Sequence, residues 1–289
     1  MAGWRDGFWW SEDSLRLHYR DYADGEHHAR PPILCLPGLT RNVRDFEGIA
    51  EALTPNWRVI CAELRGRGES AYDKNPLNYV PLIYLRDIEA LVTQLGLGRF
   101  VLFGTSLGGL LAILLGASGA GRLAGVLLND IGPVIEEEGL ARIRTYVGKG
   151  GSWPTWLHAA RAIAEVQGVA YPDYDIEDWL RMAKRLCRLT PAGRVVLDYD
   201  ARLAEPFRQV QGAAPSTDLW PTLDSLRDVP GLIVRGGLSD VLSPAIAEEM
   251  ARRLPRAELV TLPRVGHAPS LDEPEARRAI NRLLTRVAA

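Results

Sequence analysis

The sequence predicts an α/β fold built on a mostly parallel, doubly wound sheet. Short apolar runs alternate with helical patterns, and several of these runs lack the polar–apolar alternation of a strand with one solvent-exposed face. Such strands are buried on both faces, which requires helices on both sides of the sheet. The 289 residues, 47% of them hydrophobic, suffice for one large domain or for a domain with a sizeable insertion.

The first half of the chain supplies most of the predicted sheet. We expect strands at 15–22, 33–38, 57–64, 99–104 and 123–130, with helices at about 43–53, 82–96 and 107–117. The second of these helices has its apolar residues on one face and ends at Gly96. The third is apolar on every side, which predicts a buried helix.

The pattern changes between Pro133 and about Pro221. Strand-like runs disappear, and helical patterns rich in arginine, tryptophan and tyrosine replace them. We therefore expect residues 133–221 to form a helical cap, inserted after the strand that ends at Asp130. The core then consists of 1–132 and 222–289, and its second part contains predicted strands at 231–237 and 257–262 and helices at about 244–253 and 273–287.

Composition and charge narrow the possible partners. The formal net charge of −2 gives no basic surface for nucleic acid and no bias toward a membrane. The N-terminus lacks a secretory pattern, and two of the three cysteines, Cys35 and Cys61, lie in apolar runs typical of buried thiols. These features predict a cytoplasmic protein with a small-molecule substrate and no nucleic-acid or membrane partner; the oligomeric state is not predicted.

A serine stands where the predicted strand at 99–104 ends and the buried helix begins. The segment Gly104-Thr105-Ser106-Leu107-Gly108 fits the pattern G-x-S-x-G. That pattern is typical of a tight strand-to-helix turn in which small residues leave the serine hydroxyl free. The helix N-terminus also favours negative charge that develops beside the serine. The alternative interpretation is a glycine-rich turn that only permits close helix–sheet packing.

A nucleophilic serine needs a base, and the base needs an acid that orients it. The late histidine is His267, which directly follows the last predicted strand in "RVGHAPSLDEP". The acid is expected between serine and histidine in the chain. Two aspartates stand at strand ends in that interval, Asp130 in "VLLND" and Asp240 in "LIVRGGLSD".

Five motifs in this order resemble the α/β-hydrolase fold, in particular its capped branch of esterases, enol-lactonases and carbon–carbon-bond hydrolases. They are the serine turn, "CLPGLTRN", "ELRGRGES", "GGLSD" and "GHAPSL", and the resemblance spans about residues 12–287. It implies Ser106 as nucleophile and His267 as base. Because the family's acid follows the strand after the cap, it also implies Asp240 as the acid. Asp130 is the alternative, and otherwise a hydrogen-bonding residue at the entry to the cap.

The resemblance also implies an oxyanion hole made of two backbone amides, those of Leu39 and Leu107. Many relatives carry a histidine before the glycine of the first loop, where this chain has Pro37-Gly38. The change leaves the amide donors in place but removes a side chain that often braces the loop. We expect Pro37 to brace it instead, through its fixed φ.

The implied activity is hydrolysis of a small to medium carboxylic ester or lactone through an acyl-enzyme, with no metal or organic cofactor. Two alternatives stay open: hydrolysis of a carbon–carbon bond in a ring-cleavage diketo acid, and a non-catalytic ligand-binding role. The tryptophan and tyrosine residues of the cap are expected mainly to pack, with one or two lining an apolar pocket. The basic residues between Arg181 and Arg188 predict a solvated helix face, or else a residue that reaches a substrate carboxylate.

Overall fold

The computed structural model describes residues 3–23, 30–209 and 218–288. Over these residues the main sheet has eight strands in the order β1-β2-β4-β3-β5-β6-β10-β11. β2 pairs antiparallel with β1 and β4, and all the other neighbours are parallel, which confirms the predicted mostly parallel sheet. The strands are β1 (Arg5–Trp10), β2 (Arg16–Tyr22), β3 (Ile33–Leu36), β4 (Val59–Ala62), β5 (Phe100–Thr105), β6 (Leu123–Asn129), β10 (Gly231–Gly236) and β11 (Ala257–Leu262).

The edge strand β1 was not predicted from the sequence. Most of its residues are exposed, its apolar run is limited to Phe8-Trp9-Trp10, and Gly7 precedes that run. A Cβ at Gly7 would lie 2.2 Å from the ring of Tyr19, which explains why a residue without a side chain stands there.

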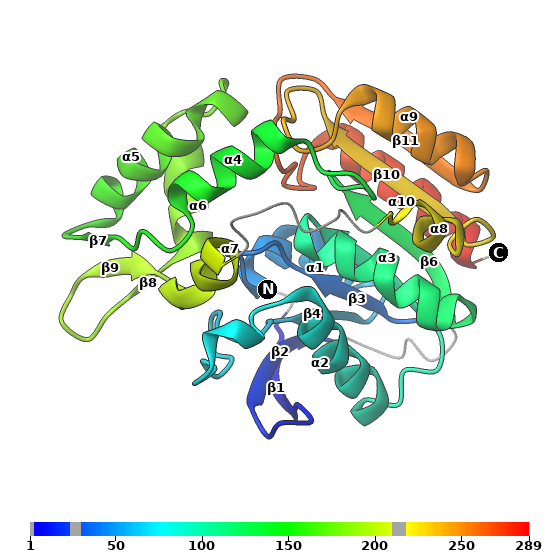
Figure 1. Ribbon diagram of the computed structural model, residues 1–289, viewed down its shortest axis with the longest axis horizontal. Helices are drawn as coiled ribbons and strands as arrows, with labels where there is room; N and C mark the ends of the chain where they lie inside the picture. The colour runs from blue at the N-terminus through cyan, green and yellow to red at the C-terminus, as the bar shows by residue number, and fades with distance from the viewer. Residues whose placement is uncertain (1–2, 24–29, 210–217, 289) are drawn as a thin grey trace.

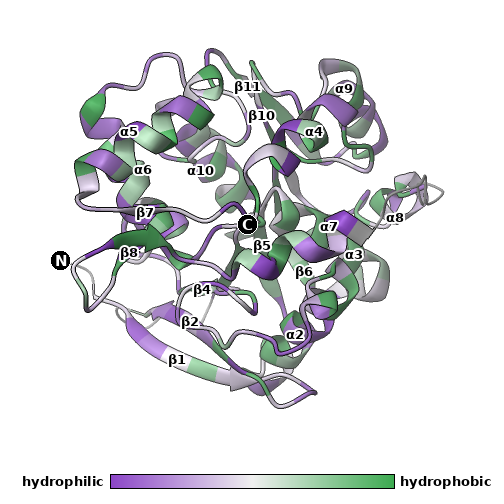
Figure 2. Ribbon diagram, turned by 60° about the vertical axis from the view of Figure 1, so that its left-hand side comes forward, coloured by the Kyte–Doolittle hydropathy of each residue, from purple (hydrophilic) through white to green (hydrophobic). Residues whose placement is uncertain are grey.

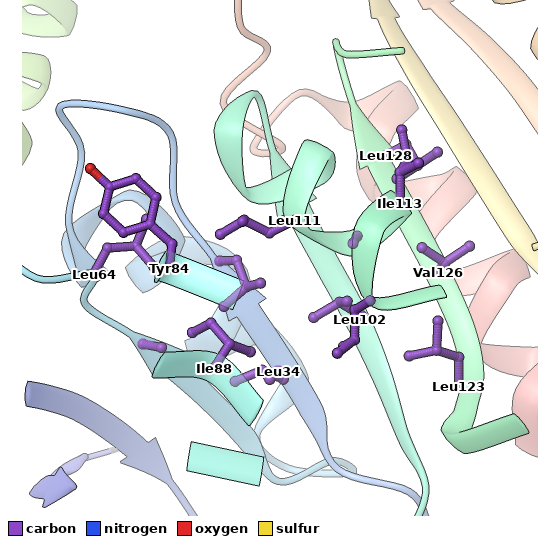
Figure 3. Packing of buried hydrophobic residues seen from close by; sticks show 14 of the residues in the cluster. Leu34, Leu64, Tyr84, Ile88, Leu102, Leu111, Ile113, Leu123, Val126 and Leu128 are labelled. Carbon is purple, nitrogen blue, oxygen red and sulfur yellow. The ribbon is translucent and has the colours of Figure 1, made fainter. Parts of the chain in front are cut away.

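Helices cover both faces of the sheet (Figure 1). Alternate residues of each buried strand point to opposite faces, so Leu34 packs toward α2 and α3 whereas Ile33 packs toward α1 and α10. Figure 3 shows the first of these layers, in which Leu111 and Ile113 of α3 lie over Leu102 of β5. The helices of the core are α1 (Glu47–Leu53), α2 (Pro81–Gln94), α3 (Leu107–Gly119), α8 (Trp220–Asp224), α9 (Pro244–Arg253) and α10 (Pro274–Ala288).

Polar residues cover the outer face of α9. In Figure 2 the central strands are mostly hydrophobic, whereas α9 carries hydrophilic and hydrophobic residues on different sides. The buried residues of α9 are Ala247 and Met250, three positions apart, as expected for a helix with one face on the core. No helix in the described part of the chain is long and apolar enough to cross a bilayer. All three cysteines are buried and unpaired.

The predicted cap segment, 133–221, is helical but also contains strands, so the expectation that strands disappear there was wrong. Its described elements lie together on one side of the main sheet (Figure 1). A small antiparallel sheet, in the order β7-β9-β8, packs with the helices around Trp179 and Met182. The division of the chain into core and cap domains at these boundaries remains a prediction. The elements are α4 (Glu137–Tyr146), β7 (Ser152–Trp153), α5 (Trp156–Gln167), α6 (Ile176–Leu186), β8 (Cys187–Leu189), β9 (Val195–Leu197) and α7 (Glu205–Gln209).

Candidate active site

Ser106 occupies a sharp turn between β5 and α3. Its backbone has φ 52° and ψ −116°, a conformation that costs free energy in a residue with a side chain. The glycines on either side make the turn possible. A Cβ at Gly104 would lie 2.4 Å from the carbonyl oxygen of Gly108, and a Cβ at Gly108 would lie 2.0 Å from that of Leu36. The turn is therefore as tight as the G-x-S-x-G pattern predicts.

A continuous chain of hydrogen bonds joins Ser106 to His267 and Asp130. Ser106 Oγ lies 2.8 Å from His267 Nε2, and His267 Nδ1 lies 2.8 Å from Asp130 Oδ2. An ionised carboxylate only accepts hydrogen bonds, so Nδ1 carries the proton and Nε2 accepts the proton of the serine hydroxyl. This is the arrangement in which a histidine can remove the serine proton.

Two further donors hold the carboxylate of Asp130, which is completely buried. The Gly236 amide donates to Oδ1 at 2.8 Å, and the Ser239 hydroxyl donates to Oδ2 at 2.6 Å. Together with His267 they give this buried carboxylate three donors, as an ionised group without water requires. Asp130 follows β6 directly, and its amide donates to Val234 O of β10 at 2.7 Å, so both strands fix its position.

The expectation that Asp240 orients His267 is corrected by this geometry. Asp240 forms an ion pair with Arg142 of α4, in which Arg142 Nη2 lies 2.8 Å from Asp240 Oδ1 and Nε donates to Oδ2. In the "GGLSD" turn the side chain directed at Asp130 is that of Ser239, and Asp240, the next residue, turns toward the cap. The alternative acid, Asp130, is the carboxylate that contacts His267.

Arg142 lowers the pKa of Asp240. Partial burial by itself raises the pKa of Asp240, but the hydrogen bonds and positive charge of Arg142 outweigh it and hold the pKa below its ordinary value. The ion pair of Asp240 with Arg142 joins the loop after β10 to α4. Gly139, also in α4, packs on the same turn, since a Cβ there would lie 2.5 Å from the Asp240 carbonyl oxygen.

The two amides predicted for the oxyanion hole belong to two segments that lie next to Ser106. Leu107 is the first residue of α3, where backbone amides have no partner within the helix. Leu39 lies in the loop after β3 and lines the cavity beside Ser106. That loop is close to the serine, because a Cβ at Gly38 would lie 3.5 Å from Ser106 Cβ. The oxyanion role of both amides remains a proposal.

Arg67, which sequence reasoning missed, supports the Leu39 loop. Its Nε donates to the Leu39 carbonyl at 2.8 Å and its Nη1 donates to the Arg65 carbonyl at 2.5 Å. The side chain is fully buried, and its guanidinium lies over the ring of Tyr84, 4.7 Å from the centroid. We expected Pro37 to brace this loop. Arg67 of the "RGRG" motif also contributes to the bracing, through its hydrogen bond to the Leu39 carbonyl.

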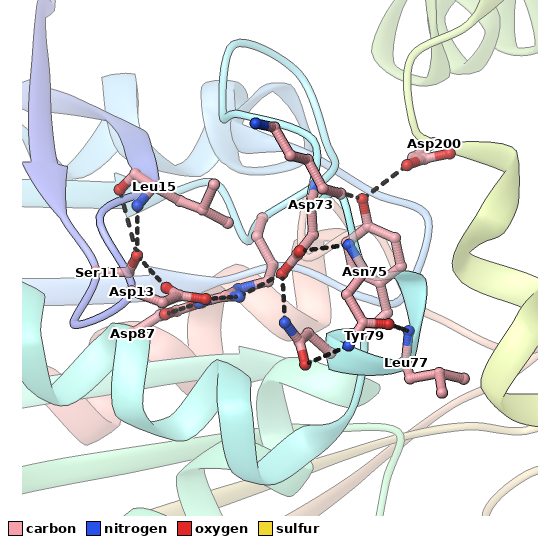
Figure 4. A network of polar contacts seen from close by, with 12 residues as sticks. Ser11, Asp13, Leu15, Asp73, Asn75, Leu77, Tyr79, Asp87 and Asp200 are labelled. Carbon is pink, nitrogen blue, oxygen red and sulfur yellow. Dashed lines mark hydrogen bonds and ion pairs between the residues drawn. The ribbon is translucent and has the colours of Figure 1, made fainter.

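A buried polar network fixes the segment that carries Arg67 (Figure 4). Arg65 donates to Asp13, Asp73 and Asp87 from within the core. Burial raises the pKa of Asp87 to about 6, against the opposing effect of Arg65. Tyr79 extends the network toward the cap segment by donating to Asp200 at 2.7 Å. The polar network that supports the segment carrying Arg67 therefore has hydrogen bonds both within the core and to the cap segment.

Residues from the core and the cap segment also hold the loop after His267. Asn129 Nδ2 donates to the Pro269 carbonyl at 2.8 Å, and the Tyr171 hydroxyl donates to the Ala268 carbonyl at 2.7 Å. The backbone carbonyl of Asn129 accepts a hydrogen bond from the Ser106 amide at 2.9 Å, so one residue contacts both the serine turn and the histidine loop. Neither contact has a sequence signal, because each joins residues far apart in the chain.

A cavity of about 780 Å³ opens above the serine. Core loops supply the part around Ser106 and His267, and the cap segment supplies the opposite walls. Several aromatic residues from the cap segment line it, more than the one or two expected from the sequence, and burial raises the pKa of Tyr174 to about 12. The aromatic residues concerned include Tyr146, Trp153, Tyr171 and Tyr174.

In the part of the chain that the structure describes, no group of three or more histidine, cysteine, aspartate or glutamate side chains is arranged to hold an ion.

Residues 33–279 match the model of the alpha/beta hydrolase family. The chain belongs to this family. It is 32% identical over 265 residues to a 3-hydroxybutyrate-oligomer hydrolase from Cupriavidus necator, covering 89% of this chain and 90% of that protein. These matches confirm the predicted hydrolase and the expected fold, and they favour an enzyme over a non-catalytic ligand-binding protein.

Solved structures agree with this hydrolase over nearly its whole length. A crystal structure of an alpha/beta hydrolase from Novosphingobium aromaticivorans is 55% identical, with a TM-score of 0.94 and 99% coverage of both chains. The structure of an E-2-(acetamidomethylene)succinate hydrolase has a TM-score of 0.78 over 99% of this chain and 100% of its own. At 24% identity, the second similarity supports the fold alone.

Proposed function

We propose that this hydrolase cleaves carboxylic esters or lactones of small to medium size through an acyl-enzyme on Ser106. The observation that carries the proposal is the hydrogen-bonded chain from Ser106 through His267 to Asp130 at one end of the cavity. The similarity to a 3-hydroxybutyrate-oligomer hydrolase supports an oligoester or a related short ester as substrate.

In the proposed reaction, His267 Nε2 takes the hydroxyl proton as Ser106 Oγ attacks the carbonyl carbon. Asp130 holds the imidazole through Nδ1 and stabilises the positive charge that forms on it. The amides of Leu39 and Leu107 donate to the oxyanion of the tetrahedral intermediate. His267 then returns the proton to the leaving alcohol, and water releases the acyl group by the same steps in reverse order.

The cavity sets the expected size of the substrate. A volume of about 780 Å³ suits a compact ligand, and cap side chains lie opposite the serine. Short acyl chains or a small ring fit such a space, whereas long-chain triglycerides need an open groove. We expect 4-nitrophenyl acetate or butyrate to be cleaved at least about tenfold faster than the palmitate ester, in terms of kcat/KM.

The test is a panel of 4-nitrophenyl esters, lactones, 3-hydroxybutyrate oligomers and ring-cleavage diketo acids, assayed with the wild type and with Ser106→Ala. Ser118→Ala is the matched control, because Ser118 is an exposed serine of the same helix. Activity on short esters or lactones that disappears only in Ser106→Ala supports the proposal. Exclusive turnover of the diketo acids, preference for palmitate, or full activity of Ser106→Ala would overturn it.

A further inference from the structure

Arg41 lies on the cavity wall, two residues beyond Leu39. Its aliphatic part is close to the nucleophile: a Cβ at Gly38 would lie 3.3 Å from Arg41 Cγ and 3.5 Å from Ser106 Cβ. The Arg41 side chain keeps 25% of its surface exposed, and it borders the cavity. A positively charged residue thus shares the cavity wall with Ser106, although none of the proposed chemical steps uses it.

Asp45 fixes one edge of the Arg41 guanidinium. Arg41 Nε donates to Asp45 Oδ2 at 2.6 Å, and Nη2 donates to Oδ1 at 2.7 Å. A guanidinium has further donors, so this pair leaves both N–H groups of Nη1 and one of Nη2 without a partner among the described residues. The free N–H groups form a second fork of the shape that binds a carboxylate through two parallel hydrogen bonds.

The guanidinium keeps its charge in this position. Burial alone lowers the pKa of Arg41, but the charge and hydrogen bonds of Asp45 outweigh it and raise the pKa above the ordinary arginine value. Because Asp45 holds the group in one orientation, binding an anion at the free fork costs little side-chain entropy.

The other arginines of the cavity differ from Arg41. Arg181 pairs with Asp178 at a mostly exposed position of the cap, and Arg185 donates a single N–H to Asp272 at 2.5 Å. Neither has the two-point contact that orients Arg41. The sequence suggested that a basic residue between Arg181 and Arg188 could reach a substrate carboxylate. The two-point contact with Asp45 instead favours Arg41, a residue of the core.

The remaining charged groups of the cavity are of both signs. Lys149 and Glu165 are both exposed and opposite in sign. Glu273 Oε1 accepts hydrogen bonds from the amide and hydroxyl of Ser270 at 2.9 and 3.0 Å, whereas its Oε2 is buried and has no partner among the described residues. Asp45 and Asp272 are both engaged by arginines.

We propose that Arg41 recognises a carboxylate of the substrate, so that this hydrolase prefers esters whose acyl or alcohol part carries a free carboxylate. The inference rests on the proposed function, since it names the substrate class of the same site. Two charge-assisted hydrogen bonds in a partly desolvated cavity discriminate a carboxylate from a neutral amide by about tenfold to a hundredfold.

Two pairs of probes test the preference. One is mono-4-nitrophenyl adipate with its terminal amide, which varies the acyl part; the other is the 3-hydroxybutyrate dimer with its carboxamide, which varies the alcohol part. The wild type is expected to show an acid-to-amide ratio of kcat/KM of about ten or more in at least one pair. Ratios near one in both pairs would overturn the proposal.

Variants assign the preference to Arg41. Arg41→Gln and Arg41→Lys are expected to lower the acid-to-amide ratio at least fivefold, and Arg181→Gln, a matched cavity arginine, is expected to retain it. The double variant Arg41→Gln with Asp45→Asn replaces the ion pair by a neutral pair and avoids an unpaired buried carboxylate. A preference that survives in the folded double variant, as judged by Tm, would contradict the role of Arg41.

Binding to Ser106→Ala separates this inference from the proposed function. Calorimetric titration of this variant with the adipate probe and its amide measures recognition without turnover. Tighter binding of the acid that depends on Arg41 supports the inference, and equal binding of acid and amide overturns it. Undiminished turnover by Ser106→Ala would instead overturn the proposed function alone.

Discussion

Strands β6 and β10 are neighbours in the sheet, and an aspartate follows each of them, yet the two carboxylates have different surroundings. Asp130 comes immediately after β6, is fully buried and accepts from His267, Gly236 and Ser239. Asp240 stands in the loop after β10, keeps 21% of its side chain exposed and pairs with Arg142. The contrast shows that the sheet fixes the side-chain direction of a residue that directly follows a strand. The side-chain direction of a loop residue depends on the path of its loop.

The difference also separates two tasks. The carboxylate of Asp130 is held by neutral donors and by the imidazole, which suits a group that orients His267 and stabilises its charge. The carboxylate of Asp240 is neutralised by a guanidinium from α4, which suits a contact between core and cap. The predictions below either sharpen this division or break it.

The largest effect is expected from Ser106 and His267, which have the same roles whichever aspartate is the acid. Ser106→Ala and His267→Ala should each lower kcat on 4-nitrophenyl acetate by at least about a thousandfold, and the double variant should be scarcely worse than either, because the two residues act as one unit. Steady-state kinetics measures this, with His158→Ala, an exposed histidine, as control. Losses that multiply in the double variant would show that the two do not share a step.

The next largest effect should distinguish the aspartates. Asp130→Asn should lower kcat by two or more orders of magnitude, because an amide in place of the carboxylate removes the acceptor that sets the tautomer of His267. Asp240→Asn should change kcat less than about tenfold. Each variant is the isosteric control of the other, and circular dichroism checks that both fold. A more severe loss in Asp240→Asn would reverse the assignment.

The smallest effect concerns the Arg142–Asp240 ion pair, which is partly exposed and therefore contributes modestly to stability. A carboxyl whose pKa is lowered in the folded protein stabilises it above the pKa of the unfolded chain and loses this contribution as pH falls through the lowered value. Asp240→Asn should thus lower Tm by a few degrees at pH 7, and the difference should vanish well below about pH 4. A difference in Tm that is unchanged across this range would show that the pair does not contribute through charge.

Much of the fold could be predicted because its signals are local. Continuous apolar runs such as "ILCL" and "VICA" need two covering layers, and the helix at Pro81–Gln94 carries its apolar face in its own sequence. β1 was not recognised because its apolar run has only three residues, Phe8 to Trp10, whereas β11 at the other edge of the sheet was predicted. The strands of the cap segment have only two or three residues each, too few for a pattern to be recognised.

The site divides in the same way. Ser106 could be predicted because its tight turn requires residues without side chains at Gly104 and Gly108. His267 could be predicted because it follows the last strand. The choice of Asp240 over Asp130 was wrong, since both fit the chain order and only the path of the "GGLSD" loop decides which side chain is turned inward. Arg41 was missed because its importance comes from Asp45 and the cavity rather than from a motif.

The rate at which a fluorophosphonate labels Ser106 tests the central claim most directly, because it needs no knowledge of the natural substrate. Intact-protein mass spectrometry follows the adduct in the wild type, Ser106→Ala, Asp130→Asn and Asp240→Asn under the same conditions. We expect one adduct in the wild type, none in Ser106→Ala, labelling slowed at least about a hundredfold in Asp130→Asn, and a nearly unchanged rate in Asp240→Asn. Rapid labelling of Asp130→Asn together with slow labelling of Asp240→Asn would contradict the assignment of Asp130 as the partner of His267.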